Sequence, residues 1–288
     1  MISTRLVFAA VLALVSLLPC PSIAADYTGP MIDAHSHVPS PKAIDAYAAA
    51  MKRHGVAKVL LLGVGGIQKD DPAWIAAAVK KYPDLVLPAL PLGDPLSATA
   101  AAKLDETLAA GGYRAVGEVH VRQVSRKIDR KLDDPAFGPI LDVVAKHKVP
   151  LVVHLELDGA STAALSTALK KHAGAVVVLA HGGEGPPGRV EALLKTHPNL
   201  MVDLSGMHFQ RTPALATETG PLDPAWKALI EKMPDRFMIG IDVWAAKLFE
   251  PAMLDKLMRW TRRVLGELSP AVAEQVAFRN AAKLFRAQ

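Results

Sequence analysis

Cysteine is nearly absent from this chain of 288 residues, which contains only Cys20. One thiol cannot form an intramolecular disulfide, so the sequence excludes a small fold held together by disulfide bonds. Membrane-spanning runs are missing too, because the apolar stretch at residues 6–18 is shorter than the roughly 20 residues that cross a bilayer. After residue 25 the sequence also lacks low-complexity segments and internal repeats, which excludes a fibrous chain.

The surplus of positive charge is small. The 33 Lys and Arg against 28 Asp and Glu give a formal net charge of +5 and a pI near 9.2. The basic residues are spread over most of the predicted helices and form no long stripe, so we interpret them as solvated surface and expect no nucleic-acid partner. Hydrophobic residues make up 51% of the chain, which is enough for a large core.

The first 25 residues have the pattern of a secretory signal peptide. Arg5 provides a positive start, residues 6–18 form the apolar region, and Ser22-Ile23-Ala24 offers the small residues that a signal peptidase needs. We expect cleavage near residue 25 and export to the periplasm or the medium. The mature protein, residues 26–288, would then be a single domain without cysteine and without a stable membrane anchor.

Short apolar, β-branched runs alternate with Ala- and Leu-rich segments of helical length through the rest of the chain. The runs predict eight strands, at 31–37, 58–64, 85–91, 115–121, 150–156, 176–182, 200–206 and 237–243. The segments between them predict helices at 41–54, 72–82, 97–110, 135–147, 160–172, 188–196, 223–232 and 251–265. Because the strands are apolar almost throughout, as a parallel sheet covered on both faces requires, we predict an α/β fold. It is a single (β/α)₈ TIM barrel rather than an open sheet, with an extra C-terminal helix at 270–286 outside the ring.

The stretch Met31-Ile32-Asp33-Ala34-His35-Ser36-His37 ends in two histidines one residue apart. Side chains alternate along a strand, so His35 and His37 are expected on the same face with their imidazoles side by side. Pro39 and Pro41 follow and place the pair at the C-terminal end of the strand, where parallel α/β proteins bind ligands. Two imidazoles that converge on one point form half of a metal site.

The ten histidines divide by their position in this pattern. Four sit in the last turns of predicted helices, where a basic side chain complements the helix dipole, and we interpret them as structural: His54, His147, His172 and His197. The other six lie in strands or just after them, at the barrel end that carries the chemistry: His35, His37, His120, His154, His181 and His208.

Two carboxylates lie within apolar strands of the same pattern. Glu118 is in the middle of the fourth strand, and Asp242 ends the eighth. A buried carboxylate is costly without a cation, a hydrogen-bond donor or a metal. Because histidines end strands one, five and six around the same mouth, a metal cage explains both acids better than two separate hydrogen-bonded core acids do.

Together these residues resemble the amidohydrolase superfamily of metal-dependent hydrolases. The resemblance rests on polar residues of the first, fourth, fifth, sixth and eighth strands: Asp33-x-His35-x-His37, Glu118, His154, Ala180-His181-Gly182-Gly183 and Asp242. The ending Asn280-Ala281-Ala282-Lys283-Leu284-Phe285 is similar to that of the amidohydrolase-related branch, which also contains decarboxylases. The resemblance covers essentially the whole chain after the signal segment and implies one or two divalent metal ions.

The resemblance also implies a role for each residue. The two histidines of the first strand and Asp242 would ligate one ion, and His154 would bind the same ion or a second one. His181 would either ligate the second ion or donate a hydrogen bond to the substrate. Glu118 stands where many superfamily members carry a carbamylated lysine that bridges two metals. A glutamate at this position resembles the pattern of TatD-like deoxyribonucleases and some lactonases. It leaves open whether Glu118 bridges two ions or contacts one.

The expected chemistry follows from such a cage. A divalent ion lowers the pKa of a bound water to about 7, which provides a nucleophile. Asp242 is expected to act as general base and to pass the proton to the leaving group, while the metal or His181 polarises the oxygen on which charge develops. His120 shares the inward face with Glu118 and would contact the substrate or hold Glu118 in place. Further substrate-binding candidates, near the ends of strands, are Arg122, Glu156, His208 and Trp244.

We therefore expect an exported metal-dependent hydrolase that cleaves an ester, lactone, amide or related bond of a small substrate, with a mild preference for anionic carbonyl compounds. The alternatives are a metal-dependent decarboxylase, a TatD-like phosphodiesterase and a binding protein without turnover. Export and the lack of a basic stripe disfavour the nuclease, and the presence of Asp242 disfavours the binding protein. Zinc suits the ligands best, and manganese, iron or nickel would also fit. The sequence leaves the substrate, the number of ions and any homo-oligomeric state open.

Overall fold

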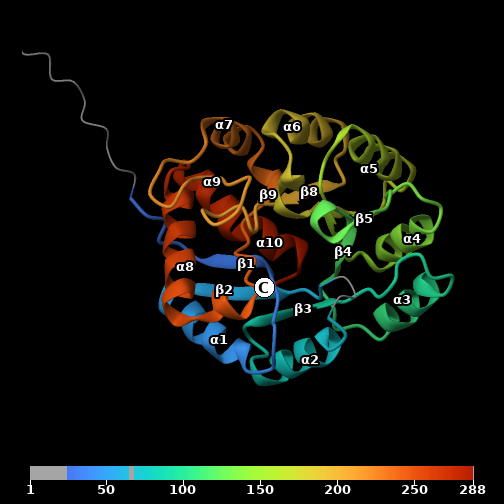
Figure 1. Cartoon of the computed structure of the whole chain (residues 1–288), viewed down its shortest axis with the longest axis horizontal. Coiled ribbons are helices and arrows are strands. Elements are labelled where there is room, and N and C mark those ends of the chain that lie inside the picture. Colours follow the sequence, from blue (N-terminus) through green and yellow to red (C-terminus); the bar gives the residue numbers. More distant parts are fainter. Residues whose placement is uncertain (1–24, 65–67, 288) are drawn as a thin grey trace, which may run out of the picture.

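Eight parallel strands form a barrel in the order in which they follow one another along the chain (Figure 1). The computed structural model describes residues 25–64 and 68–287. The barrel strands are β1 (Met31–Ser36), β2 (Val56–Leu61), β3 (Val86–Leu90), β4 (Ala115–Gln123), β6 (Leu151–Leu155), β7 (Val177–Leu179), β8 (Leu200–Asp203) and β9 (Phe237–Met238). The short strand β5 (Ile128–Asp129) lies off this path and pairs antiparallel with the end of β4. All eight predicted strands are therefore confirmed.

Backbone hydrogen bonds between β1 and the segment after β9 join the two ends of the sheet. The amide of Ala34 donates to the carbonyl of Ile239 at 3.0 Å, and the amide of Asp242 donates to the carbonyl of His35 at 2.8 Å. Further along, the amide of His37 donates to the carbonyl of Val243 at 2.9 Å. These bonds confirm the predicted ring, and they bring the first and last strands of the barrel together at the end where their polar residues lie.

Helices between the strands cover the outside of the ring, as the alternation predicted (Figure 1). They are α1 (Ala43–His54), α2 (Asp71–Lys81), α3 (Ala100–Ala109), α4 (Phe137–His147), α5 (Gly159–Lys171), α6 (Pro187–Thr196), α7 (Pro224–Lys232) and α8 (Pro251–Gly266). Apolar side chains of these helices pack on the outward-facing residues of the strands, with Tyr47, Phe137 and Ile140 fully buried. None of the described helices is both long and apolar enough to cross a membrane.

The C-terminal helical segment closes the bottom of the barrel. It consists of α9 (Pro270–Glu274), a π-helical turn (Gln275–Arg279) and α10 (Asn280–Leu284), and Figure 1 shows α10 near the centre of the ring. Ala281 and Phe285 are buried in one cluster with the inward-facing side chains of the strands. The prediction of a final helix was correct, but its expected place outside the ring was wrong. The apolar lower end of the barrel interior needs a cover, and this segment provides it.

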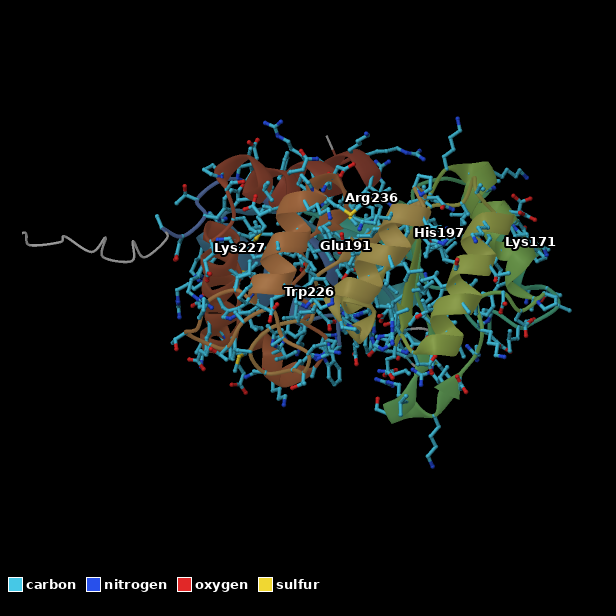
Figure 2. All side chains as sticks on the ribbon, turned by 90° about the horizontal axis from the view of Figure 1, so that it is seen from above. Lys171, Glu191, His197, Trp226, Lys227 and Arg236 are labelled. Atoms are coloured by element: carbon cyan, nitrogen blue, oxygen red, sulfur yellow. The ribbon has the colours of Figure 1, made fainter. Side chains whose placement is uncertain are left out.

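The four histidines at helix ends are bonded to neighbouring helices, which confirms their structural interpretation. The contacts are His54 with Asp255 at 2.7 Å, His147 with Asp105 at 2.6 Å, His172 with Asp142 at 2.7 Å and His197 with Ser166 at 2.8 Å. The carbonyl of His197 also accepts a hydrogen bond from Arg236 at 2.6 Å, and Figure 2 labels both residues. The predicted signal peptide and Cys20 lie outside the described residues, apart from Ala25.

Register irregularities in β1 and β4 turn polar side chains toward the barrel mouth. Ile32 and Ala34 belong to the interior cluster, and strict alternation from them would send His35 outward. The pairing of β1 with β2 shifts between Asp33 and Ser36, and the pairing of β4 with β6 shifts between Val116 and Val119. Such irregularities re-aim side chains next to active sites. Here they let His35 of β1, His37 directly after it (together the β1 histidines) and Glu118 of β4 face the same space.

Candidate metal centre

The two imidazoles of β1 meet at the C-terminal mouth of the barrel, where Nε2 of His35 lies 3.3 Å from Nε2 of His37. Nδ1 of His37 donates to the carbonyl of Leu62 at 2.9 Å, and Nδ1 of His35 donates to the carboxylate of Asp203 at 3.0 Å. Because each Nδ1 donates, the two Nε2 atoms face each other, and each would present a lone pair to the other if both rings were neutral. That arrangement repels unless a proton or a metal cation lies between them.

Glu118 is the hub of the centre. Its Oε1 lies 3.1 Å from Nδ1 of His154 and 3.1 Å from Nε2 of His181, and its Oε2 lies 3.1 Å from Nε2 of His120. The β1 histidines are slightly farther away, with Nε2 of His35 at 3.8 Å and Nε2 of His37 at 3.7 Å. The Glu118 carboxylate therefore stands between the imidazoles of His35 and His37 on one side and those of His154 on β6 and His181 after β7 on the other.

A left-handed turn after β7 aims His181 at this hub. The backbone φ angles of His181, Gly182 and Gly183 are 57°, 58° and 63°. Gly182 and Gly183 adopt such angles without strain, whereas a histidine does so at a cost, and strain of this kind gathers at functional sites. Nδ1 of His181 donates to the carbonyl of Ser205 at 2.9 Å, and this contact holds the ring with Nε2 facing Oε1 of Glu118 at 3.1 Å.

Asp242 supplies the second carboxylate of the centre. Its Oδ1 lies 3.6 Å from Nε2 of His37, and its Oδ2 forms an ion pair with the guanidinium of Arg211. Asp242 has a φ of 56°, and its side chain is 3% exposed. Arg211 comes from the long segment between β8 and α7, so this segment contributes a cation directly to the centre.

The donor atoms fit a divalent metal. Metal–nitrogen and metal–oxygen bonds of about 2.0–2.2 Å hold ligand atoms about 3–4 Å apart. Three buried groups have one ligand atom from each residue within 4.8 Å of the others: His35, His37 and Asp242; His35, Glu118 and His181; and Glu118, His120 and His154. Imidazole and carboxylate donors suit zinc and the other first-row divalent ions. All six predicted ligands, His35, His37, Glu118, His154, His181 and Asp242, lie in these groups.

The electrostatics of the centre indicate a strong demand for positive charge. Burial would lower the pKa of His35, but the Asp203 and Glu118 carboxylates outweigh it and raise that pKa to about 10. Burial and the charge on His35 lower the pKa of His37 to about 4. Burial would raise the pKa of Glu118, but His35 and three histidine hydrogen bonds hold it well below its usual value. A divalent cation would supply the positive charge that the protein otherwise obtains by protonating an imidazole.

The centre opens into a cavity of about 630 Å³. His120, His208 and Trp244, which were predicted to bind substrate, are among its lining residues, and Trp244 is 45% exposed. The lining also includes a set of hydrogen-bonding and positively charged side chains that come from loops: Gln123, Arg126, Gln210, Arg211 and Lys247. A cavity of this size accommodates a small molecule.

Arg122 and Glu156, the other two predicted substrate-binding residues, bond mainly to the protein beside the cavity. Arg122 donates to the carbonyl of Glu156 at 2.9 Å and pairs with Asp158 at 3.1 Å. The carboxylate of Glu156 accepts two hydrogen bonds from the amide of Val124, at 3.1 and 3.0 Å. These contacts connect the end of β4 to the loop after β6, and the two charges largely neutralise each other.

Sequence reasoning missed three residues that touch the centre: Asp203, Arg211 and Glu184. Asp203 was detectable, because it ends the apolar strand β8 just as Asp242 follows β9, and it is fully buried. Arg211 and Glu184 gave no comparable signal. Arg211 lies in the irregular segment after β8 and Glu184 ends the short turn after β7, so their side-chain directions follow from the fold and not from a local period.

Comparisons with known proteins agree with the barrel fold described above. A family model described as "Amidohydrolase" matches residues 29–287. A crystal structure described as a "probable 2-pyrone-4,6-dicarboxylic acid hydrolase" from Acinetobacter baumannii, with citric acid bound, is 15% identical with a TM-score of 0.64, over 89% of this chain and 99% of that one. No curated protein sequence matches the chain.

Two decarboxylases are similar in structure as well. One is a dihydroxybenzoic acid decarboxylase from a Polaromonas species with bound manganese and 2-nitroresorcinol, at 14% identity and a TM-score of 0.62, over 90% of this chain and 97% of that one. The other is a 5-carboxyvanillate decarboxylase from Sphingomonas paucimobilis, at 17% identity and a TM-score of 0.60, over 89% of this chain and 99% of that one. At these identities the likeness shows a shared fold.

Proposed function

The chain belongs to the amidohydrolase family, and from this premise we propose that it is a metal-dependent hydrolase that cleaves an ester, lactone or amide bond of a small carboxylated substrate. One observation carries the proposal. The Asp242 carboxylate lies at the cavity, 3.6 Å from Nε2 of His37, beside the point on which the two β1 imidazoles converge. A carboxylate there can take a proton from water that is activated next to the substrate.

Zinc is our proposal for the metal, since the donors are imidazoles and carboxylates, and manganese, iron and nickel are the alternatives. A divalent ion in this centre would act as a Lewis acid and lower the pKa of a bound water to about 7. Oε1 of Glu118 lies 3.1 Å from both His154 and His181, and Nε2 of His35 and of His37 lie 3.8 and 3.7 Å from the carboxylate on the other side. This position between two ligand groups supports a bridging role and hence two ions.

The residues of the chain divide the remaining tasks. Asp242 accepts the proton of the attacking water and returns it to the leaving group, a proton transfer that contributes typically 10²–10⁴-fold. His181 is held by Ser205 and faces Glu118, so it would be one of the ligands that hold the metal in the centre. His120 lies between Oε2 of Glu118, 3.1 Å from its Nε2, and the side-chain oxygen of Gln123, 2.8 Å from its Nδ1, and these two contacts position Glu118.

The proposed preference for a carboxylated substrate comes from the cavity walls. Arg126, Arg211 and Lys247 line the cavity together with the histidines, and a guanidinium binds a carboxylate with two parallel hydrogen bonds. Arg211 holds the carboxylate of Asp242 through Nη1 and lies 3.5 Å from Glu184 through Nη2, and its side chain is 28% exposed at the cavity. A dicarboxylate or a carboxylated lactone would satisfy these cations.

Decarboxylation of a small acid is the second candidate. The position of Arg211 beside Asp242 favours it, because the guanidinium could hold a second carboxylate of the substrate while His181 or Asp242, in its protonated form, supplies the proton to the carbon from which carbon dioxide leaves. The two reactions differ in their products. Hydrolysis consumes one water and forms an acid with an alcohol or amine, whereas decarboxylation releases carbon dioxide.

We propose, in addition, that the protein acts after export. The support is the sequence of residues 1–25, with Arg5, the apolar run and Ser22-Ile23-Ala24. N-terminal sequencing of the protein recovered from periplasm and from medium tests this proposal. Absence of the protein from both fractions contradicts export, and a chain that retains residues 1–25 in either fraction contradicts cleavage near residue 25.

The test of the function uses protein purified without chelator. Elemental analysis gives the metal and the number of ions per chain, and panels of lactones, amides, esters and carboxylic acids, each with and without a second carboxylate, are assayed for product and for carbon dioxide. We expect turnover of a carboxylated lactone or ester without release of carbon dioxide. Release of carbon dioxide as the main product establishes the second candidate instead, and a fully metalated protein that is inactive on all panels contradicts both.

A further inference from the structure

Both ring nitrogens of His154 face carboxylates. Nδ1 lies 3.1 Å from Oε1 of Glu118 on the side of the metal centre. Nε2 lies 3.9 Å from Oε1 of Glu156 and 4.0 Å from Oε1 of Glu184 on the opposite side. Nε2 is buried and has no hydrogen-bond partner among the described residues. An unsatisfied buried nitrogen next to two carboxylates requires a reason.

The tautomer of the imidazole provides that reason. A neutral histidine has one N–H and one lone pair, and only the lone pair can bind a metal. In the absence of metal the shorter contact lets Nδ1–H donate to Glu118. When a cation occupies the space beside Glu118 and His181, Nδ1 must offer its lone pair, and the proton then resides on Nε2, toward the outer carboxylates.

The two outer carboxylates differ in their freedom to accept this proton. Glu156 already accepts two hydrogen bonds from the amide of Val124, and Arg122 lies 3.8 Å from it. Within residues 25–64 and 68–287, Glu184 accepts no hydrogen bond. Its nearest charged neighbour is the guanidinium of Arg211, at 3.5 Å.

The backbone of Glu184 supplies an independent observation. The φ angle of Glu184 is 47°, and Glu184 is the last of four consecutive left-handed residues that begin with His181. Residues other than glycine adopt the left-handed backbone conformation at a cost in free energy, and two of the four residues here are not glycine. The turn is tied to the loop after β6 by the amide of Leu157, which donates to the carbonyl of Gly183 at 2.8 Å. One strained turn thus brings His181 to the inner side of the centre and Glu184 to the outer face of His154.

We infer that Glu184 is a positioning residue, which accepts the Nε2–H of His154 and thereby commits Nδ1 of His154 to the metal. This role is distinct from the hydrolysis itself, because it concerns how tightly the chain holds its metal. A carboxylate that orients a metal-binding histidine typically changes metal affinity by about 10–100-fold when it is replaced.

The experiment measures metal affinity, not turnover. Full-length mature protein is stripped of metal and titrated with zinc in competition with a chelating indicator. We expect Glu184→Ala to raise the zinc dissociation constant about 10–100-fold. Glu184→Gln keeps a carbonyl acceptor at the same place, so we expect a smaller rise. Thermal melting of the metal-free variants should match that of the unchanged protein, because His154 then donates to Glu118.

Glu156→Gln is the matched control. It removes a negative charge at nearly the same distance from Nε2 but leaves Glu184, and we expect less than about a threefold change in zinc affinity. An equal loss in Glu156→Gln and Glu184→Ala would show that only the local negative charge matters and would overturn the inference. Unchanged zinc affinity in Glu184→Ala would overturn it as well, whatever the substrate assays show.

Discussion

The carboxylate of Asp203 lies 3.0 Å from Nδ1 of His35, and both side chains are fully buried. Asp203 comes from β8 and His35 from β1, so the contact crosses the barrel mouth between strands that are not neighbours in the sheet. It fixes the ring of His35 with Nε2 toward His37. Two further donors, the amides of His181 and Ser205, contact the other oxygen of Asp203, at 3.2 and 3.1 Å.

Replacing Asp203 is expected to weaken metal binding. In Asp203→Asn the amide loses the charge that holds the Nδ1 proton of His35, and it can present its NH₂ group where the ring needs an acceptor. We expect a rise of about 10–100-fold in the metal dissociation constant, measured by competition with a chelating indicator. An affinity equal to that of the unchanged protein would mean that His35 is oriented by its other contacts alone.

Asp242→Asn is expected to separate metal binding from turnover. The amide oxygen can still contact the metal and Arg211, but it cannot accept a proton from water. We expect most of the metal to remain and kcat to fall about 10²–10⁴-fold. Metal content by elemental analysis and kcat on the best substrate provide the measurement. Near-normal kcat would remove Asp242 from its role as general base.

Arg211→Gln tests the preference for carboxylated substrates. The change removes the guanidinium that faces Asp242 and lines the cavity. We expect KM for a carboxylated substrate to rise at least about tenfold, because a charge-assisted pair between arginine and carboxylate is lost. KM for an uncharged analogue should change little. A similar rise for both substrates would place the effect of Arg211 on Asp242 rather than on the substrate.

The stability of the protein is expected to fall in mild acid, in part through His208. Burial, with a contribution from Arg211, lowers the pKa of His208 to about 4, whereas an unfolded histidine titrates near 6.5. The unfolded chain therefore binds the proton first, and the contribution of the neutral ring is complete above pH 6.5 and is lost as the pH falls toward 4. Between pH 7.5 and 5 the loss is about 1–2 kcal/mol.

His208→Gln removes that dependence. Guanidinium unfolding of the metal-free protein and of the variant, each at pH 7.5 and 5, should show a smaller acid loss in the variant by about 1–2 kcal/mol. The same loss in both would mean that His208 titrates alike in the folded and unfolded chains.

Gly117→Ala is expected to destabilise the barrel next to Glu118. Gly117 has a φ of 132°, and a Cβ at this position would lie 2.5 Å from the backbone carbonyl oxygen of Val152 on β6. Neither the angle nor the contact can relax without moving a strand, so we expect the free energy of unfolding to fall by about 3 kcal/mol or more. Gly188→Ala in α6 is the control, because nothing lies within 4 Å of its Cβ. This control should be neutral or stabilise by up to about 1 kcal/mol.

Local sequence alone was sufficient to predict the fold of this protein and most of the polar residues at the barrel mouth. The alternation of apolar strands and Ala-rich helices determined the barrel, because side-chain periods of 2 and 3.6 residues reflect which face of each element is buried. Position relative to strand ends separated the six histidines of the mouth from the four at helix ends. Glu118 and Asp242 were detectable because a carboxylate in an apolar strand needs a partner.

The tertiary structure decided what those partners are. The contacts of Asp203 with His35 and of Arg211 with Asp242 join residues 168 and 31 positions apart, and no local period encodes such pairs. The left-handed turn at 181–184 and the shifted register of β1 redirect side chains against the simple alternation. The C-terminal helix covers the barrel interior because an apolar opening at the lower end must be kept from water. Each of these features depends on the packing of distant segments against one another, and only the folded chain brings those segments together.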